Sequence, residues 1–156
     1  MKKFRLLTAG LLLLVVLSGC SVISGDIRSK ADPLLTFELV SPYPAQYAGE
    51  IVIWGGYIIE NQADHGHNRL VILQTPLSFN QEPKSRDTSQ GRFIVRSDQY
   101  LDPEVYAKGR AVTVAGRVAD FTTNLDDAYG SYPVLHLLEV YIWKNRYRDH
   151  YYPSSP

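Results

Sequence analysis

Short apolar stretches separated by turn-forming residues recur along the chain from Leu34 onward. Their lengths are those of β-strands rather than of helices. The stretch at 110–120 places Val112 and Val114 on one side and Thr113 on the other, which is the period-two pattern of a half-buried strand. On this basis we predict five strands, at 50–59, 69–75, 92–96, 110–120 and 135–143.

The segment between the third and fourth predicted strands carries signals for a short helix. Asp102 is a suitable N-cap, Pro103 fits the first helical position and Gly109 suits the C-terminal stop, so we expect one or two turns over 101–109. Three strands, a short helix and two strands is the order of elements in an OB-fold. The pattern therefore predicts a mainly β domain, a small five-stranded antiparallel barrel of OB-like order.

A glycine pair, Gly55-Gly56, lies in the middle of the first predicted strand. Glycines at such a position allow a strand to bulge and bend sharply, which closure of a small barrel requires. This favours the barrel, and an open antiparallel sheet is the alternative.

The first 20 residues follow a different pattern. A basic start at Lys2-Lys3 precedes the apolar run 11–17, and the small residues Ser18-Gly19 precede Cys20. This three-part arrangement resembles a bacterial lipoprotein signal, in which residues 1–19 are removed. The resemblance implies that Cys20 becomes the first residue and carries three acyl chains, which is ample for stable membrane anchoring.

The anchor has consequences for location. In the common sorting rule for lipoproteins, Asp directly after the lipidated Cys retains a protein in the inner membrane, so Ser21 favours the outer membrane, with the domain facing the periplasm. Cys20 is the only cysteine, so no internal disulfide forms. We expect a lipidated polar tether at 20–33, the barrel at 34–144 and a flexible Tyr-rich tail at 145–156.

Charge and aromatic content restrict the partners. Removal of the signal leaves 13 of the 16 basic residues against 16 acidic ones, a net charge of −3, and no dense basic patch for nucleic acid remains. The chain has 11 Tyr and 2 Trp, which either build the core or supply stacking surfaces for sugars or peptides. For the second use, the candidate ligand face is Trp54, Tyr57 and Tyr141.

Candidate chemistry is sparse. His65-Gly66-His67 is the best metal candidate, with Asp64 adjacent and His136 distant in sequence, but zinc normally takes three or four protein ligands, so we interpret the segment as a solvated loop. No nucleophile motif is present, and Asp126-Asp127 fits a solvated hairpin loop. We therefore expect no enzyme, no cofactor and no metal site.

Several short motifs occur in one order along the chain and together resemble the Slp family of Gram-negative outer-membrane lipoproteins. The resemblance implies an envelope component, since some members are associated with starvation or stationary phase, and it supplies no catalytic residue. Arg92 and Arg110 within these motifs either hold structural partners or form an anion site. The motifs are Tyr47-Ala48-Gly49, Trp54-Gly55-Gly56, Pro76-Leu77, Gly91-Arg92-Phe93, Leu101-Asp102-Pro103, Tyr106, Gly109-Arg110, Val112-Thr113-Val114, Gly116, Tyr132-Pro133 and Trp143.

Overall fold

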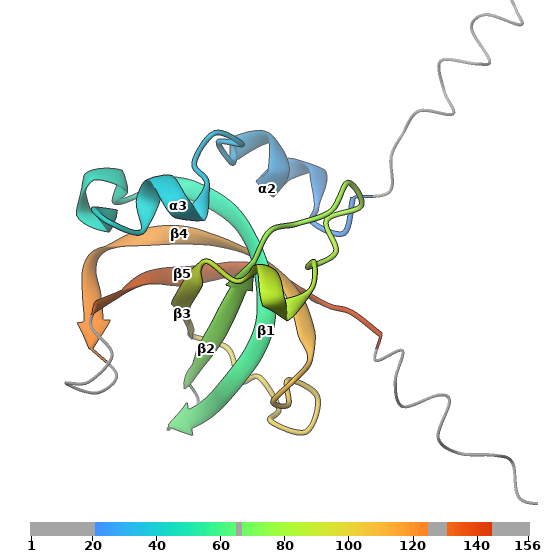
Figure 1. The fold of residues 1–156 in the computed structure, drawn as a ribbon. Helices are drawn as coiled ribbons and strands as arrows, with labels where there is room; N and C mark the ends of the chain where they lie inside the picture. The colour runs from blue at the N-terminus through green and yellow to red at the C-terminus, as the bar shows by residue number, and fades with distance from the viewer. Residues whose placement is uncertain (1–20, 65–66, 125–130, 145–156) are drawn as a thin grey trace, which may run out of the picture.

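Five strands close into a barrel in the order β1-β2-β3-β5-β4 (Figure 1). The computed structural model describes residues 21–64, 67–124 and 131–144. All neighbouring strands are antiparallel except β3 and β5, which run parallel. This is the strand order of an OB-fold, so the predicted fold class is confirmed. The strands are β1 (Ile51–Asp64), β2 (His67–Thr75), β3 (Gly91–Ser97), β4 (Ala111–Asn124) and β5 (Ser131–Ile142).

Strand β1 is longer than predicted and bends at a different place. Residues 60–64 are mostly polar and lack an apolar pattern, but they continue to pair with β2. The register shift lies between Ile58 and Glu60, whereas Gly55 and Gly56 pair without interruption. A Cβ on Gly56 would lie 2.0 Å from the carbonyl oxygen of Leu73, so this glycine permits a close backbone approach.

The helix expected over 101–109 is replaced by hydrogen-bonded turns. Leu101 is buried, and the Asn68 side chain bonds both its backbone N–H and its carbonyl. Further along, the N–H of Gly109 donates to the carbonyl of Ile58 in β1. Because both ends of the segment are held by the barrel, only separate turns form between them, one after Asp102 and one from Ala107 to Arg110.

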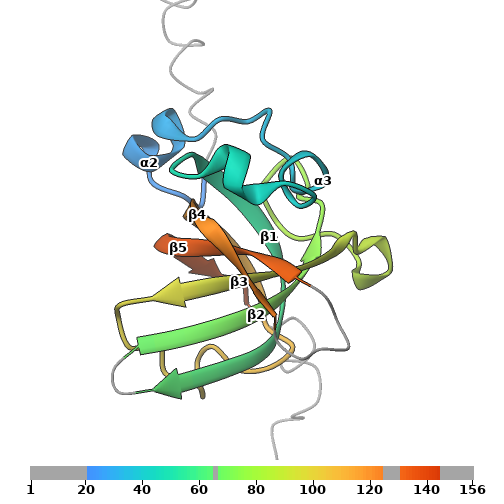
Figure 2. The ribbon, with the colours of Figure 1, turned by 90° about the vertical axis from the view of Figure 1, so that its left-hand side faces the viewer.

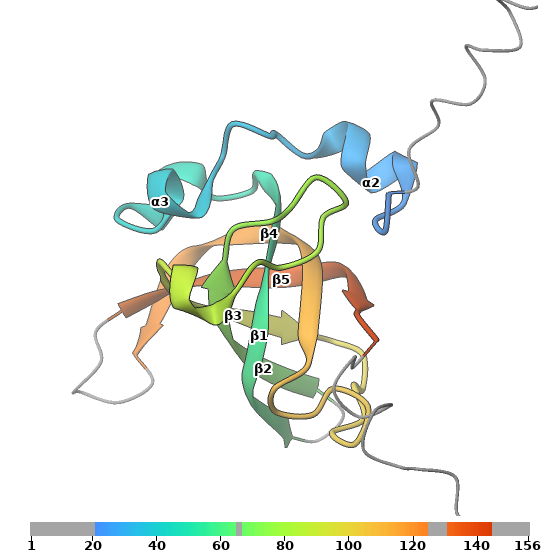
Figure 3. The same cartoon turned by 45° about the vertical axis from the view of Figure 1, so that its right-hand side comes forward.

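The N-terminal segment crosses one end of the barrel (Figures 1 and 3). It contains α2 (Gly25–Lys30), α3 (Phe37–Val40) and the 3-10 helix η2 (Pro44–Tyr47). A tether was expected at 20–33. Residues 21–33 instead pack on the domain, since they include α2 and the side chain of Ile23 is only 1% exposed. Ile23 directly precedes the N-cap of α2 and anchors this stretch to the domain, because its burial removes hydrocarbon from water.

Inward-facing residues of all five strands form one apolar core, and Figure 2 shows the barrel wall that surrounds it. Three rings meet near the N-terminal segment, where Trp54 contacts Phe37 and Phe93 edge to face at centroid distances of 5.3 and 5.4 Å. Such aromatic packing closes this end of the barrel. The core strand residues are Val52, Trp54, Ile58, Leu70, Ile72, Phe93, Val95, Val112, Val114, Val118 and Leu135.

Candidate functional site

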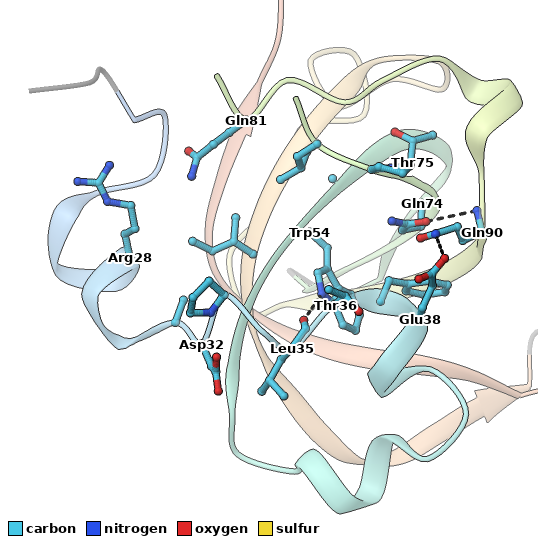
Figure 4. A pocket seen from close by; sticks show the side chains of 17 residues that line it. Arg28, Asp32, Leu35, Thr36, Glu38, Trp54, Gln74, Thr75, Gln81 and Gln90 are labelled. Atoms are coloured by element: carbon cyan, nitrogen blue, oxygen red, sulfur yellow. Dashed lines mark hydrogen bonds between the residues drawn. The ribbon is translucent and has the colours of Figure 1, made fainter. Parts of the chain in front are cut away.

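A cavity opens between the N-terminal segment and the connection from β2 to β3 (Figure 4). Its volume of about 630 Å³ lies within the usual range for small-ligand sites. Trp54 and Phe37 contribute an aromatic floor, and Leu35 and Leu77 contribute apolar walls from the two covering segments. The cavity thus exists because the N-terminal segment and the β2–β3 connection both fold over the rim of the barrel.

Amide side chains form a polar wall of this cavity. Gln74 is buried at the end of β2, and its Oε1 accepts a hydrogen bond of 3.3 Å from the backbone N–H of Gln90. The side-chain amide of Gln90 donates in turn to the carboxylate of Glu38 in α3 (Figure 4). This chain of hydrogen bonds holds the Gln74 amide in place and ties α3 to the start of β3.

Thr75, the last residue of β2, also lines the cavity and is fully buried. Within the described part of the chain, its hydroxyl oxygen has no hydrogen-bond partner. Buried hydroxyls in folded proteins nearly always have a partner, and leaving one unpaired carries a free-energy cost. The Thr75 hydroxyl therefore has an unused capacity to donate and accept a hydrogen bond just beneath this wall of the cavity.

The three aromatic residues predicted as a ligand face do not share one. Trp54 is 4% exposed, its ring packs in the core, and its Nε1 donates to the carbonyl of Leu35, because its position in β1 faces the barrel interior. Tyr57 and Tyr141 lie on the outer surface. The Tyr57 hydroxyl donates to the carbonyl of Lys84, and Tyr141 stacks edge to face on Trp143.

A second depression at the other end of β2 is lined by both His67 and His136, which lie far apart along the chain. Strand register aligns Arg69, Arg96 and His136 in one row across β2, β3 and β5. Neighbouring guanidinium groups disfavour a metal cation. Among the described residues, no group of three His, Cys, Asp or Glu side chains could hold a metal ion, and His65-Gly66 lies outside them.

Arg110 holds structural partners, which was one of the two roles predicted for it, the other being an anion site. Its guanidinium donates to the carbonyls of Val105 at 3.3 Å and Trp143 at 3.0 Å. These bonds join the turn segment after β3 to the end of β5, so this arginine is engaged within the domain.

The comparisons with known proteins agree with the N-terminal signal. The model of the "Outer membrane lipoprotein Slp family" matches residues 17–156, which includes every residue after the predicted signal. The chain belongs to this family. Its predicted signal and the family name together make it an outer-membrane lipoprotein. Among the described residues, no helix is long and apolar enough to cross a membrane.

Two relatives from Escherichia coli K12 match parts of the chain. The "Uncharacterized lipoprotein YeaY" is 31% identical over 120 residues, covering 76% of this chain and 60% of the relative. The "Outer membrane protein Slp" is 29% identical over 117 residues, covering 72% of this chain and 62% of the relative. The chain therefore spans about three fifths of the length of these curated Slp-family relatives.

A solved structure also resembles the barrel. The mitochondrial single-stranded DNA binding protein Rim1 from S. cerevisiae superposes with a TM-score of 0.41 at 16% identity. The match covers 62% of this chain and 97% of the yeast chain.

The candidate cavity could not be found from the sequence. Gln74 and Thr75 end an apolar strand, and Gln90 lies 15 residues beyond Thr75 with no shared motif. They meet only because β2 and β3 pair as neighbours and the N-terminal segment folds back over their rim.

Proposed function

We propose that this Slp-family lipoprotein is a non-enzymatic binding module that the acylated Cys20 holds at the outer membrane, with the barrel in the periplasm. Its ligand is an N-acetylated glycan segment of the envelope. The observation that carries this proposal is the cavity wall formed by Gln74, Gln90 and the unpartnered Thr75 hydroxyl. A link to starvation or stationary phase would determine when the module is made.

The chemistry of the cavity supports a neutral, amide-bearing sugar. Glutamine amides both donate and accept hydrogen bonds, and a threonine hydroxyl does the same, which suits sugar hydroxyls and acetamido groups. The apolar surfaces of Leu35 and Leu77 offer contact for an acetamido methyl group or a sugar ring face. Asp32, Glu38 and Arg28 also line the cavity, and two carboxylates against one guanidinium leave its charged lining net negative, which disfavours an anionic ligand.

The lining residues support binding rather than catalysis. The described wall contains no His, Cys or Ser that could act as a base or nucleophile. Its two carboxylates have structural partners, since Asp32 Oδ1 accepts from the N–H of Leu34 and Glu38 accepts from Gln90. Glycoside hydrolysis uses two carboxyl groups on either side of the bond to be cleaved, one as an acid and the other as a base or nucleophile. The hydrogen bonds of Asp32 and Glu38 do not assign them these two roles.

Isothermal titration calorimetry of the lipidated protein in detergent with N-acetylglucosamine oligomers tests the proposal. We expect saturable binding that Thr75→Val weakens, because the substitution keeps the shape and removes the hydroxyl. Thr88→Val serves as the matched control, since Thr88 is exposed and lies outside the cavity. Absence of binding, or equal binding by both variants, would contradict the assignment of this cavity.

A further inference from the structure

Phe79 is the most exposed large apolar residue in the described part of the chain, at 106% of its reference area. It lies in the connection between β2 and β3, at the tip of a small hairpin formed by residues 77–83. A phenyl ring that contacts water on all sides contributes nothing to the core. A surface that buried this ring would remove its whole apolar area from water.

The hairpin that carries Phe79 is rigidly bonded. The N–H of Ser78 donates to the carbonyl of Glu82 at 2.8 Å, and the N–H of Gln81 donates to the carbonyl of Ser78 at 2.9 Å. Gln81 has a positive φ of 67°, an uncommon conformation for a residue with a Cβ. Its carbonyl accepts a 2.6 Å hydrogen bond from the hydroxyl of Thr113 in β4. The ring is thus presented on a turn fixed to the barrel.

The same hairpin holds the N-terminal end of the described chain. The Ser21 hydroxyl donates to Oε1 of Gln81 at 2.8 Å, only two residues from Phe79. Ile23 is buried, and the N–H of Ser24 donates to both carboxylate oxygens of Glu139 at 3.1 Å. Figure 1 shows the chain entering the domain beside the tip of the β2–β3 connection.

The hydrogen bond between Ser21 and Gln81 holds the hairpin close to Cys20, the predicted site of lipid attachment. Cys20 directly precedes Ser21, and consecutive Cα atoms are only about 3.8 Å apart. An acyl group on Cys20 therefore enters the bilayer within a few residue lengths of Phe79. The anchor also keeps the ring at high effective concentration near the membrane, so one phenyl group is enough to engage it.

We propose that the hairpin 77–83 docks on the lipid bilayer, with Phe79 inserted among the acyl chains beside the anchor. This inference rests on the proposed acylation of Cys20. The contact removes the ring from water and gives the barrel one fixed orientation on the membrane. Residues 21–24 transmit this orientation because they are bonded to the hairpin and to β5.

Quenching of tryptophan fluorescence by brominated lipids tests the contact. The lipidated mature protein is reconstituted into phosphatidylcholine vesicles with bromine on the acyl chains, as the Phe79→Trp variant. Tyr43→Trp is the matched control, because Tyr43 is an aromatic residue, 65% exposed, between α3 and η2. Helix α3 lies on the opposite side of the barrel end from the tip of the β2–β3 connection (Figure 1). The unsubstituted protein supplies the background emission of Trp54 and Trp143.

We expect the added indole at position 79 to show blue-shifted emission that bromine quenches, and the indole at position 43 to show neither effect. Mass spectrometry of the same samples establishes whether Cys20 is acylated. A missing acyl mass would contradict the anchor itself. An acylated protein whose residue 79 is not quenched, or is quenched no more than residue 43, would overturn the docking surface. A blue shift without quenching would also overturn it and indicate that a second copy of the chain covers the ring.

Discussion

The indole Nε1 of Trp54 donates a hydrogen bond of 3.0 Å to the backbone carbonyl of Leu35. This bond joins the first part of β1 to the segment that leads into α3, 19 residues earlier in the chain. It makes Trp54 both a core residue and the attachment point of the N-terminal cover. The cavity below that cover depends on this attachment.

Trp54→Phe is expected to lower the free energy of unfolding by roughly 2–4 kcal/mol. The smaller ring leaves a void beside Phe37 and Phe93, and the carbonyl of Leu35 loses its donor. Urea unfolding measures the change, and hydrogen exchange of residues 32–40 reports whether the cover loosens. An unchanged midpoint with unchanged exchange would show that the indole does not hold the cover.

Gly56→Ala is expected to destabilise the barrel by about 3 kcal/mol or more, because the added methyl meets backbone rather than a movable side chain. Gly25→Ala is the matched control, since a Cβ there has nothing within 4 Å and lies at the start of α2. Thermal unfolding of the two variants should separate them clearly. Equal melting temperatures would mean that β1 and β2 can move apart at this point.

Asn68→Asp is expected to cost about 3 kcal/mol. The Asn68 amide nitrogen donates to the carbonyl of Leu101 at 2.9 Å and to Oδ1 of Asn61 at 2.7 Å. A carboxylate at position 68 cannot donate and would face both of these acceptors while buried. Chemical denaturation measures the loss, with the exposed Asn80→Asp as a control. Equal stability of the two variants would contradict the role given to Asn68.

Thr75→Val is expected to raise the free energy of unfolding by about 1 kcal/mol, although it weakens ligand binding. The substitution removes a buried hydroxyl that has no partner and leaves an apolar group of similar shape. Stability measured in the absence of any glycan isolates this effect. A decrease would indicate that the hydroxyl has a structural partner.

Some features of the fold could be predicted because they depend on local pattern. The alternation in residues 110–120 identifies β4, and the order of short apolar runs gives the OB-like barrel. The extension of β1 over residues 60–64 could not be predicted, because those residues are mostly polar and pair with β2 through backbone and side-chain hydrogen bonds that no apolar pattern encodes. The segment 101–109 carries helix signals, but the Asn68 side chain and Ile58 backbone compete successfully for its ends.

The sequence by itself determined the lipoprotein signal before Cys20, the family and the barrel, since these depend on contiguous residues and on strand periodicity. Only the tertiary structure decided that Trp54 faces inward, that Gln74, Thr75 and Gln90 share a cavity, and that Ser21 is bonded to the hairpin of Phe79. The physical reason is that these relationships join residues far apart in the chain. Their proximity follows from strand pairing and burial, which no local pattern encodes.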